Sequence, residues 1–154
     1  GTFPYPCLHA VQITETTYAL ASQPILWMNT AAAAWSSSAL DGRLHAAMTF
    51  MWGGGDYYEN CAVTLWNDYS TTPPPWTIYA DPYGNINTND KLSGDYTATR
   101  RNSFDPYSWS GSCYAPRNNG SGGVDVHVYY LWFGRTRDAK AVPTIFLPLI
   151  RRAS

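Results

Sequence analysis

Alternating apolar side chains are most regular over Val124–Gly134, the longest run of β-favouring residues in the chain. One face of this run, from Val124 to Trp132 in steps of two, is apolar throughout, whereas the other face begins polar and becomes apolar. Apolar side chains on both faces are typical of a strand that is covered on both sides. The pattern therefore predicts that residues 124–133 are a central strand paired on both sides, and we expect Val128→Asp to prevent folding.

Shorter alternating or apolar runs predict the other strands. Residues 44–52 and 61–66 are separated by a loop of Gly, Asp, Tyr, Glu and Asn, which is typical of a hairpin. In residues 11–20 the side chains of Val11 and Ile13 are expected to point inward. The remaining candidate strands are residues 25–28, 76–80, 95–100 at an edge, 112–114, and 142–150, which holds two prolines and is expected at an edge.

Two segments do not follow the strand pattern. Residues 31–40 are rich in Ala and follow Thr30, a residue that can cap a helix, so a short helix or a coil is predicted there. Residues 101–123 are rich in Ser, Tyr, Gly and Asn and read as a long loop, apart from the candidate strand at 112–114.

About eight short strands, separated by Gly, Pro and Asn, predict an all-β fold: an antiparallel β-sandwich or jelly roll, or a small barrel. The length of 154 residues fits one domain, and no internal repeat or linker divides it. Residues 1–154 are therefore predicted to be a single β-sandwich domain with long aromatic-rich loops. Residues 1–9 contain Pro4 and Pro6 and are predicted to be an extended N-terminal arm.

The composition shifts attention from catalysis to binding. Charged residues make up 14% of the chain, against roughly 25% in an average soluble domain, while aromatic residues reach 16%. A net charge of -1 argues against a nucleic-acid partner, and no apolar stretch is long enough to insert into a membrane. A surface with few charges and many Tyr, Asn and Ser side chains suits a binding face or a subunit packed against others. We expect a homo-oligomer, a trimer or larger.

Catalytic and metal-binding patterns are weak. The chain has no Gly-x-Ser-x-Gly motif, and its three histidines, His9, His45 and His127, are far apart in sequence, so structural roles are favoured over a metal site. Neither a cofactor nor a metal is predicted, because the oxygen-bearing side chains of residues 85–90 do not have calcium-loop spacing. Three cysteines, Cys7, Cys61 and Cys113, allow at most one internal disulfide and leave its pairing open.

A glycoside hydrolase would need two carboxylates that face one another across a cleft. The candidate pairs are Asp56 with Glu59 and Asp68 with Asp81. Aspartates in loops are more often turn formers, so no enzymatic activity is predicted.

Aromatic rings beside Asn, Asp and Ser are the most informative feature of the loops. A sugar offers an apolar C–H face and a rim of hydroxyls, which a flat ring and short polar side chains can contact. The alternative for each ring is that it closes one end of the core. The candidate ligand contacts are Trp66, Asp68, Tyr69, Trp76, Tyr83, Asn85, Tyr107 and Trp109.

In composition, Tyr- and Trp-rich loops and hydrophobic closing strands, the chain resembles the C-terminal domains of phage tail fibres and small β-sandwich lectins. We expect a non-catalytic domain outside a cell or on a virion surface that recognises a glycan or a surface receptor. The alternative is a structural subunit of a virion coat, fibre or extracellular filament. A compact polar cleft with two or three rings would favour recognition, whereas a broad apolar belt or an unpaired arm would favour assembly.

Overall fold

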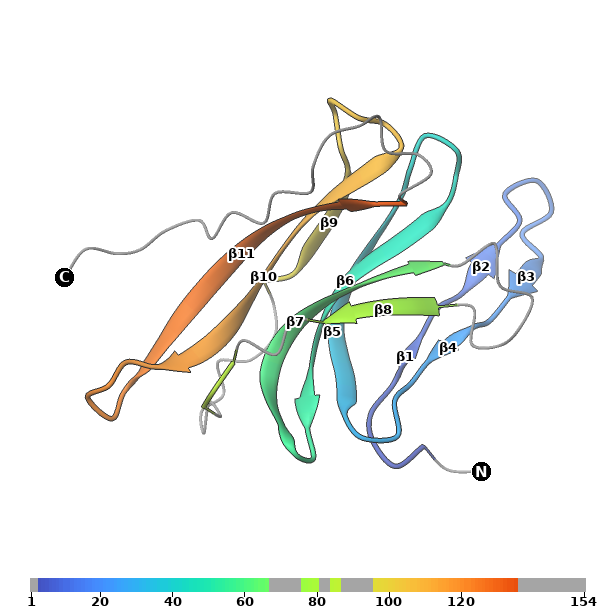
Figure 1. Ribbon diagram of the computed structural model, residues 1–154. Helices are drawn as coiled ribbons and strands as arrows, with labels where there is room; N and C mark the ends of the chain where they lie inside the picture. The colour runs from blue at the N-terminus through green and yellow to red at the C-terminus, as the bar shows by residue number, and fades with distance from the viewer. Residues whose placement is uncertain (1–2, 67–75, 81–83, 87–95, 136–154) are drawn as a thin grey trace.

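The computed structural model describes residues 3–66, 76–80, 84–86 and 96–135. These residues form four small antiparallel sheets and contain no helix (Figure 1). The all-β prediction is confirmed, while the finer prediction of a sandwich or jelly roll is not confirmed by the described strands. The strands are β1 (Leu8–His9), β2 (Gln12–Ile13), β3 (Leu20–Ser22), β4 (Ile25–Leu26), β5 (Ala32–Leu40), β6 (Ala46–Gly54), β7 (Tyr57–Trp66), β8 (Trp76–Ala80), β9 (Ala98–Arg101), β10 (Ser108–Asn118) and β11 (Val124–Gly134).

The largest sheet has the order β5-β6-β7-β8. Its centre is the predicted hairpin of β6 and β7, and the predicted strand at residues 76–80 is present as β8. Residues 47–52 of β6 are buried on both faces, because structure covers the sheet on either side. Met48, Phe50 and Trp52 lie in one core cluster, and Met51 on the opposite face lies in another.

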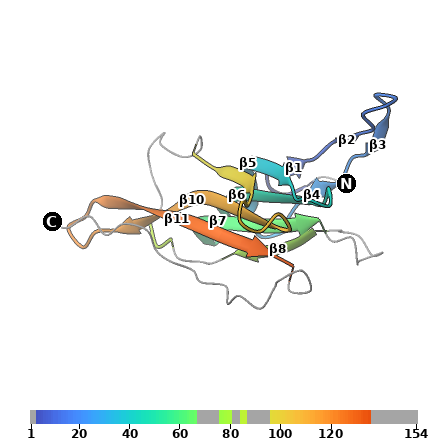
Figure 2. The same ribbon diagram turned by 90° about the horizontal axis from the view of Figure 1, so that it is seen from above.

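The second sheet, of order β11-β10-β9, covers the Met51 face of the first (Figure 2). Leu131 of β11 and Cys113 of β10 pack there against Cys61 and Val63 of β7. A disulfide joins Cys61 to Cys113, with a Cα–Cα distance of 5.6 Å, so one covalent bond links the two sheets.

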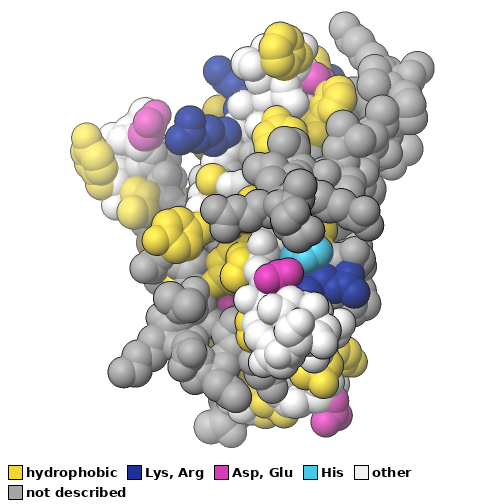
Figure 3. Space-filling view, turned by 90° about the vertical axis from the view of Figure 1, so that its left-hand side faces the viewer, with side chains coloured by type: hydrophobic (Ala, Val, Ile, Leu, Met, Phe, Trp, Pro, Cys, Tyr) yellow, Lys and Arg dark blue, Asp and Glu magenta, His cyan; other side chains and the backbone are white. Residues whose placement is uncertain are grey.

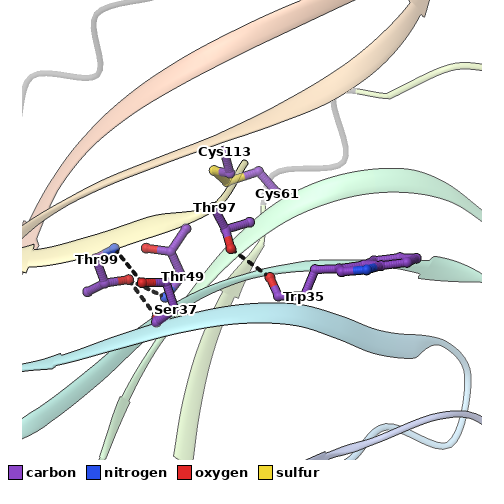
Figure 4. The surroundings of a disulfide bond; sticks show 7 residues. All are labelled: Trp35, Ser37, Thr49, Cys61, Thr97, Thr99 and Cys113. Carbon is purple, nitrogen blue, oxygen red and sulfur yellow. Dashed lines mark hydrogen bonds between the residues drawn. A yellow bond between two sulfur atoms is a disulfide. The ribbon is translucent and has the colours of Figure 1, made fainter. Parts of the chain in front are cut away.

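Side chains also connect the sheets where β5 passes β9 (Figure 4). The Thr99 hydroxyl donates to the Ser37 carbonyl at 2.7 Å, and the Thr99 N–H donates to the Ser37 hydroxyl at 3.0 Å. The Thr97 hydroxyl donates to the Trp35 carbonyl at 2.8 Å. Trp35 has φ +47° at a register shift in β5, so a β-bulge presents these backbone groups to β9.

The other face of the large sheet is covered by the N-terminal segment. The β1–β4 pair places Leu26 in the core cluster of Phe50, with Leu8 packed beside it. The Ala33 N–H donates to the Pro6 carbonyl at 3.0 Å, so residues before β1 are also tied to the body. The part of the predicted N-terminal arm that the structure describes, residues 3–9, therefore lies along the sheet.

Between β1 and β4 the chain leaves the body as the β2–β3 hairpin, which projects from one end of the molecule in both views (Figures 1 and 2). A single strand over residues 11–20 was predicted, with Val11 and Ile13 inward. That prediction is wrong, because a turn at residues 14–19 splits the segment and both side chains are more than half exposed.

The predicted helix or coil at residues 31–40 is wrong, since this segment is β5. Its residues pair with β6 from Ala32↔Gly53 to Leu40↔Ala46. Ala33 is buried in the core cluster of Phe50. Pairing and burial therefore override the helix propensity of an Ala-rich run.

The predicted long loop at residues 101–123 is largely wrong, because residues 108–118 form β10, the central strand of its sheet. The predicted edge strand at residues 95–100 is confirmed in position, as β9 lies at the edge beside β10. The run at residues 124–134 is a strand, and among the strands that the structure describes it lies at the edge of its sheet instead of in the predicted central place. Within the described residues, β11 pairs with β10 alone. The predicted strand at residues 142–150 lies outside those residues.

Candidate functional site

The turn between β5 and β6 is built around a buried carboxylate. Asp41 Oδ1 accepts hydrogen bonds from the N–H groups of Arg43 and His45, both at 2.8 Å, and Oδ2 lies 3.2 Å from His45 Nδ1. These contacts hold Leu44 at φ +64°, with its side chain exposed. A large apolar side chain in this conformation costs energy, so the carboxylate maintains a turn that presents Leu44 to solvent.

The loop before β10 lies against this turn. The Gly42 N–H donates to the Pro106 carbonyl at 2.6 Å. The Arg43 guanidinium carbon lies 4.2 Å from the centre of the Tyr107 ring, a cation–π distance. Phe104 in the same loop is almost fully exposed. Of the predicted ligand contacts, Tyr107 is thus in a surface loop beside Arg43.

Trp109 is a core residue. Its exposed fraction is 0%, its ring stacks on Phe133 with centroids 6.0 Å apart, and its Nε1–H donates to the Ala39 carbonyl at 3.1 Å. A ring with no exposed surface cannot contact a ligand in this structure. The expectation that Trp109 is a binding ring is therefore corrected: it joins β10 to β5.

Trp66 is also engaged within the fold. Its half-buried ring packs against the core cluster of Phe50, and its carbonyl accepts from Arg135 Nη2 at 2.5 Å. The guanidinium of Arg135 is buried and lies 5.7 Å from the centre of the Trp109 ring. Trp66 thus caps the core beside the end of β11. Its partner Arg135 is 69 residues away in the sequence, so the residues around Trp66 do not predict this contact.

Asn85 works as a backbone partner for β10. Its N–H donates to the Pro116 carbonyl at 3.2 Å, and its Oδ1 accepts from the Asn118 N–H at 2.8 Å. Asn85 is exposed, but its side-chain oxygen already accepts a hydrogen bond from the backbone of β10. Trp76 begins β8 and is the cross-strand partner of Trp66 in β7, while Asp68, Tyr69 and Tyr83 lie outside the described residues. The structure therefore brings the backbones of Trp66 and Trp76 side by side, whereas Asn85 and Tyr107 have other contacts.

Of the two carboxylate pairs considered for a glycoside hydrolase, the structure describes Asp56 and Glu59. Asp56 is in the exposed turn between β6 and β7, and Glu59 Oε1 accepts from the Tyr114 hydroxyl at 3.3 Å. The pair of Asp68 and Asp81 lies outside the described residues. Among residues 3–66, 76–80, 84–86 and 96–135, no cluster of three or more His, Cys, Asp or Glu has metal-site geometry.

The first prominent surface feature is the hairpin face, which we define as Val11, Ile13 and Leu20. Ile13 is paired with Leu20, and Val11 is on the same side of β2, whereas Gln12 and Ser22 are on the other side and share a 3.0 Å hydrogen bond. The hairpin is therefore amphipathic. Its apolar side is uncovered, because the three side chains are between 54% and 57% exposed, and Gln12 on the polar side is exposed too.

The second feature is the valine stripe, defined as Val124, Val126, Val128 and Tyr130 on one face of β11. The four side chains are 40% to 53% exposed, while Leu131 on the opposite face is in the core. Hydrophobic side chains reach the surface in several separate places (Figure 3). The stripe and the hairpin face lie at opposite ends of the molecule (Figure 1).

Neither apolar surface is evident from the sequence, which predicts an interior position for both segments. An apolar alternation has the same appearance whether the covering partner belongs to the same chain or to another. One signal was available for the hairpin: Thr-rich residues 14–17 interrupt the alternation between Ile13 and Leu20. In the structure these residues form a turn in which the Tyr18 N–H donates to the Thr14 carbonyl at 2.8 Å.

Comparisons of the chain with protein-family models, with curated proteins and with solved structures found no match. The described residues include no helix that is long and apolar enough to span a membrane.

Proposed function

We propose that this protein is a structural subunit of an extracellular or virion-surface assembly, such as a coat, fibre or filament, held together by contacts between copies. The observation that carries the proposal is the amphipathic β2–β3 hairpin, which projects with its apolar side uncovered. A two-stranded hairpin is marginally stable alone in water. Packing of the hairpin face against a neighbouring chain would remove its apolar surface from water and fix its position.

The number of apolar surfaces supports assembly over recognition of one small ligand. The hairpin face, the valine stripe and the loop end with Leu44 and Phe104 are three separate exposed regions. A binding module needs one such surface. A subunit with neighbours on several sides needs at least two, since a single self-complementary patch produces only a dimer.

The disulfide between Cys61 and Cys113 supports a location outside the cytosol. Disulfides form and persist mainly in oxidising compartments and at virion and cell surfaces. A cross-link between the two main sheets suits a particle that must keep its shape after release.

The recognition hypothesis, a glycan or receptor contact, has less support. Its described candidates have other roles in the fold: Trp109 is in the core, Trp66 packs against the core beside its strand partner Trp76, and Asn85 hydrogen-bonds with β10. Among the candidates that the structure describes, Tyr107, whose ring lies beside Arg43, is the one ring in a loop cluster at the surface. If a receptor is recognised, this loop end is where we would look for the contact.

Size-exclusion chromatography with light scattering tests the proposal. The unmodified protein is expected to elute as species larger than a monomer at micromolar concentration. The double variant Ile13→Thr, Leu20→Thr keeps β-favouring side chains but makes the hairpin face polar, so it is expected to shift the distribution toward monomer. Glu15→Gln changes an exposed residue of the hairpin turn and is the control. An unmodified protein that is monomeric under these conditions contradicts the proposal.

A further inference from the structure

We infer that the edge of β11 opposite β10, which has no partner strand among the described residues, pairs with β11 of a second copy in antiparallel orientation, about a two-fold axis at Val126. The inference rests on the proposed function and assigns one of its contacts. Residue i of one copy would lie opposite residue 252 − i of the other, so Val124 faces Val128 and Val126 faces itself. The two β10–β11 hairpins would then form a continuous four-stranded sheet.

The edge of β11 has few of the features that normally prevent such pairing. It is eleven residues long and contains neither Pro nor Lys. Its register with β10 is continuous from Val124 to Gly134, without a bulge. Exposed edge strands of this kind are templates for pairing with another chain unless a charge, a proline or a bulge blocks them. Within the described residues, its only partner strand is β10.

The position of the strand allows a second copy to approach. Asp125 and His127 are on the same face of β11 as the buried Leu131, yet both are exposed. This part of β11 is therefore uncovered, although Ala115 and Pro116 opposite it in β10 are buried, and the tip of the hairpin projects from the body in both ribbon views (Figures 1 and 2). Two copies can meet along residues 124–128 without contact between their cores.

The charges select the register. An axis at Asp125 would place that carboxylate opposite its own copy, and an axis at His127 would place two imidazoles together. An axis at Val128 would place Asp125 opposite the apolar Leu131. An axis at Val126 places Asp125 opposite His127 in both halves, which pairs a carboxylate with a group that can donate a hydrogen bond or carry positive charge.

The same axis also joins the apolar surfaces. A shift of one residue would move the side chains of one strand to the opposite face, because side chains alternate with a period of two. With the axis at a residue instead of between two residues, the valine stripes of the two copies lie on one face and continue each other. Val124, Val126 and Val128 then contribute cross-strand apolar pairs, which stabilise a sheet.

Disulfide trapping tests the register in the protein with Cys7→Ser, which removes the one free thiol among the described residues. After oxidation with diamide, Val126→Cys is expected to give a covalent dimer, since residue 126 faces its own copy. Val124→Cys and Val128→Cys are each expected to remain largely uncross-linked alone but to give a mixed dimer when combined. Cross-linking of Val128→Cys alone to the same extent as Val126→Cys would overturn the register.

A second variant pair separates this contact from assembly in general. Val126→Lys places two like charges at the axis and is expected to weaken dimerisation roughly tenfold or more, whereas Ser103→Lys adds the same charge to an exposed loop and should have no effect. If Val126→Lys leaves assembly unchanged and Val126→Cys stays uncross-linked while larger species persist, the β11 contact is wrong and the proposed function stands. If the unmodified protein is a monomer throughout, both are wrong.

Discussion

Cys61 of β7 and Cys113 of β10 form a disulfide that joins the two main sheets across a sequence separation of 52 residues. The bond lies in a core cluster with Met51, Val63 and Leu131, so it crosses the layer in which the sheets meet. Because the two strands are in different sheets, the bond constrains their relative placement as well as the unfolded chain.

Removal of this disulfide is expected to be the most destabilising change to the described cysteines. In the chain-entropy model, closing a loop of this length stabilises the folded state by about 4 kcal/mol. The double variant Cys61→Ala, Cys113→Ala should lose stability of that order in urea unfolding. Cys7→Ser, which leaves the bond intact, should unfold close to the midpoint of the unmodified protein. Equal midpoints for both variants would contradict a structural role for the bond.

Trp109 is expected to behave as a core residue. Trp109→Ala should destabilise the fold by about 3–5 kcal/mol, because it removes a fully buried ring and leaves a cavity beside Phe133. Phe104→Ala is the matched aromatic control, since that ring is almost fully exposed and its loss should change stability by about 0.5 kcal/mol or less. Urea unfolding distinguishes the two. A Trp109→Ala protein of nearly unchanged stability would show that the ring is not structural.

Asp41 is expected to stabilise the β5–β6 turn through its acceptor oxygens. Asp41→Ala leaves the N–H groups of Arg43 and His45 without this acceptor and should cost about 2 kcal/mol. Asp41→Asn retains an acceptor oxygen and should cost less. Thermal unfolding of the two variants measures the difference, and a loss for Asn as large as that for Ala would point to the charge instead of the hydrogen bonds.

Val128→Asp is expected to fold, contrary to the expectation from the sequence. The side chain is 53% exposed on an edge strand, so a carboxylate there remains hydrated and should change stability by about 0.5 kcal/mol. Circular dichroism and urea unfolding at concentrations where the protein is monomeric provide the measurement. A variant that cannot fold would show that the Val128 side chain is buried, as the sequence predicts.

The sequence was sufficient for strands whose pattern is local. The β6–β7 hairpin and β8 were predicted because their alternation and flanking turn residues are contained in the segments themselves. The Ala-rich β5 was missed because local propensity favours a helix, whereas pairing with β6 and the burial of Ala33 decide the outcome.

The β10 strand was missed because, apart from Trp109, its inward face consists of the small residues Gly111, Cys113 and Ala115, which resemble a loop. Glycine is required at position 111, because a Cβ there would overlap the Thr49 hydroxyl of the opposing sheet. Such close packing depends on a contact between residues that are far apart in sequence. Local alternation therefore contains no sign of it.

The candidate site was predicted less well than the fold. The sequence predicts surface positions for rings near polar residues, yet Trp109 is in the core and the half-buried Trp66 packs against it, while apolar segments predicted to be interior are exposed. Alternation identifies a face that must be covered but not the chain that covers it. The valine stripe and the hairpin face are, in this account, covered by other copies.

Sedimentation velocity of the unmodified protein over a micromolar dilution series tests this central claim most directly. The account predicts species larger than a monomer whose proportion increases with concentration, because the exposed hairpin face and valine stripe are contact surfaces. A single monomeric species at every concentration would contradict it.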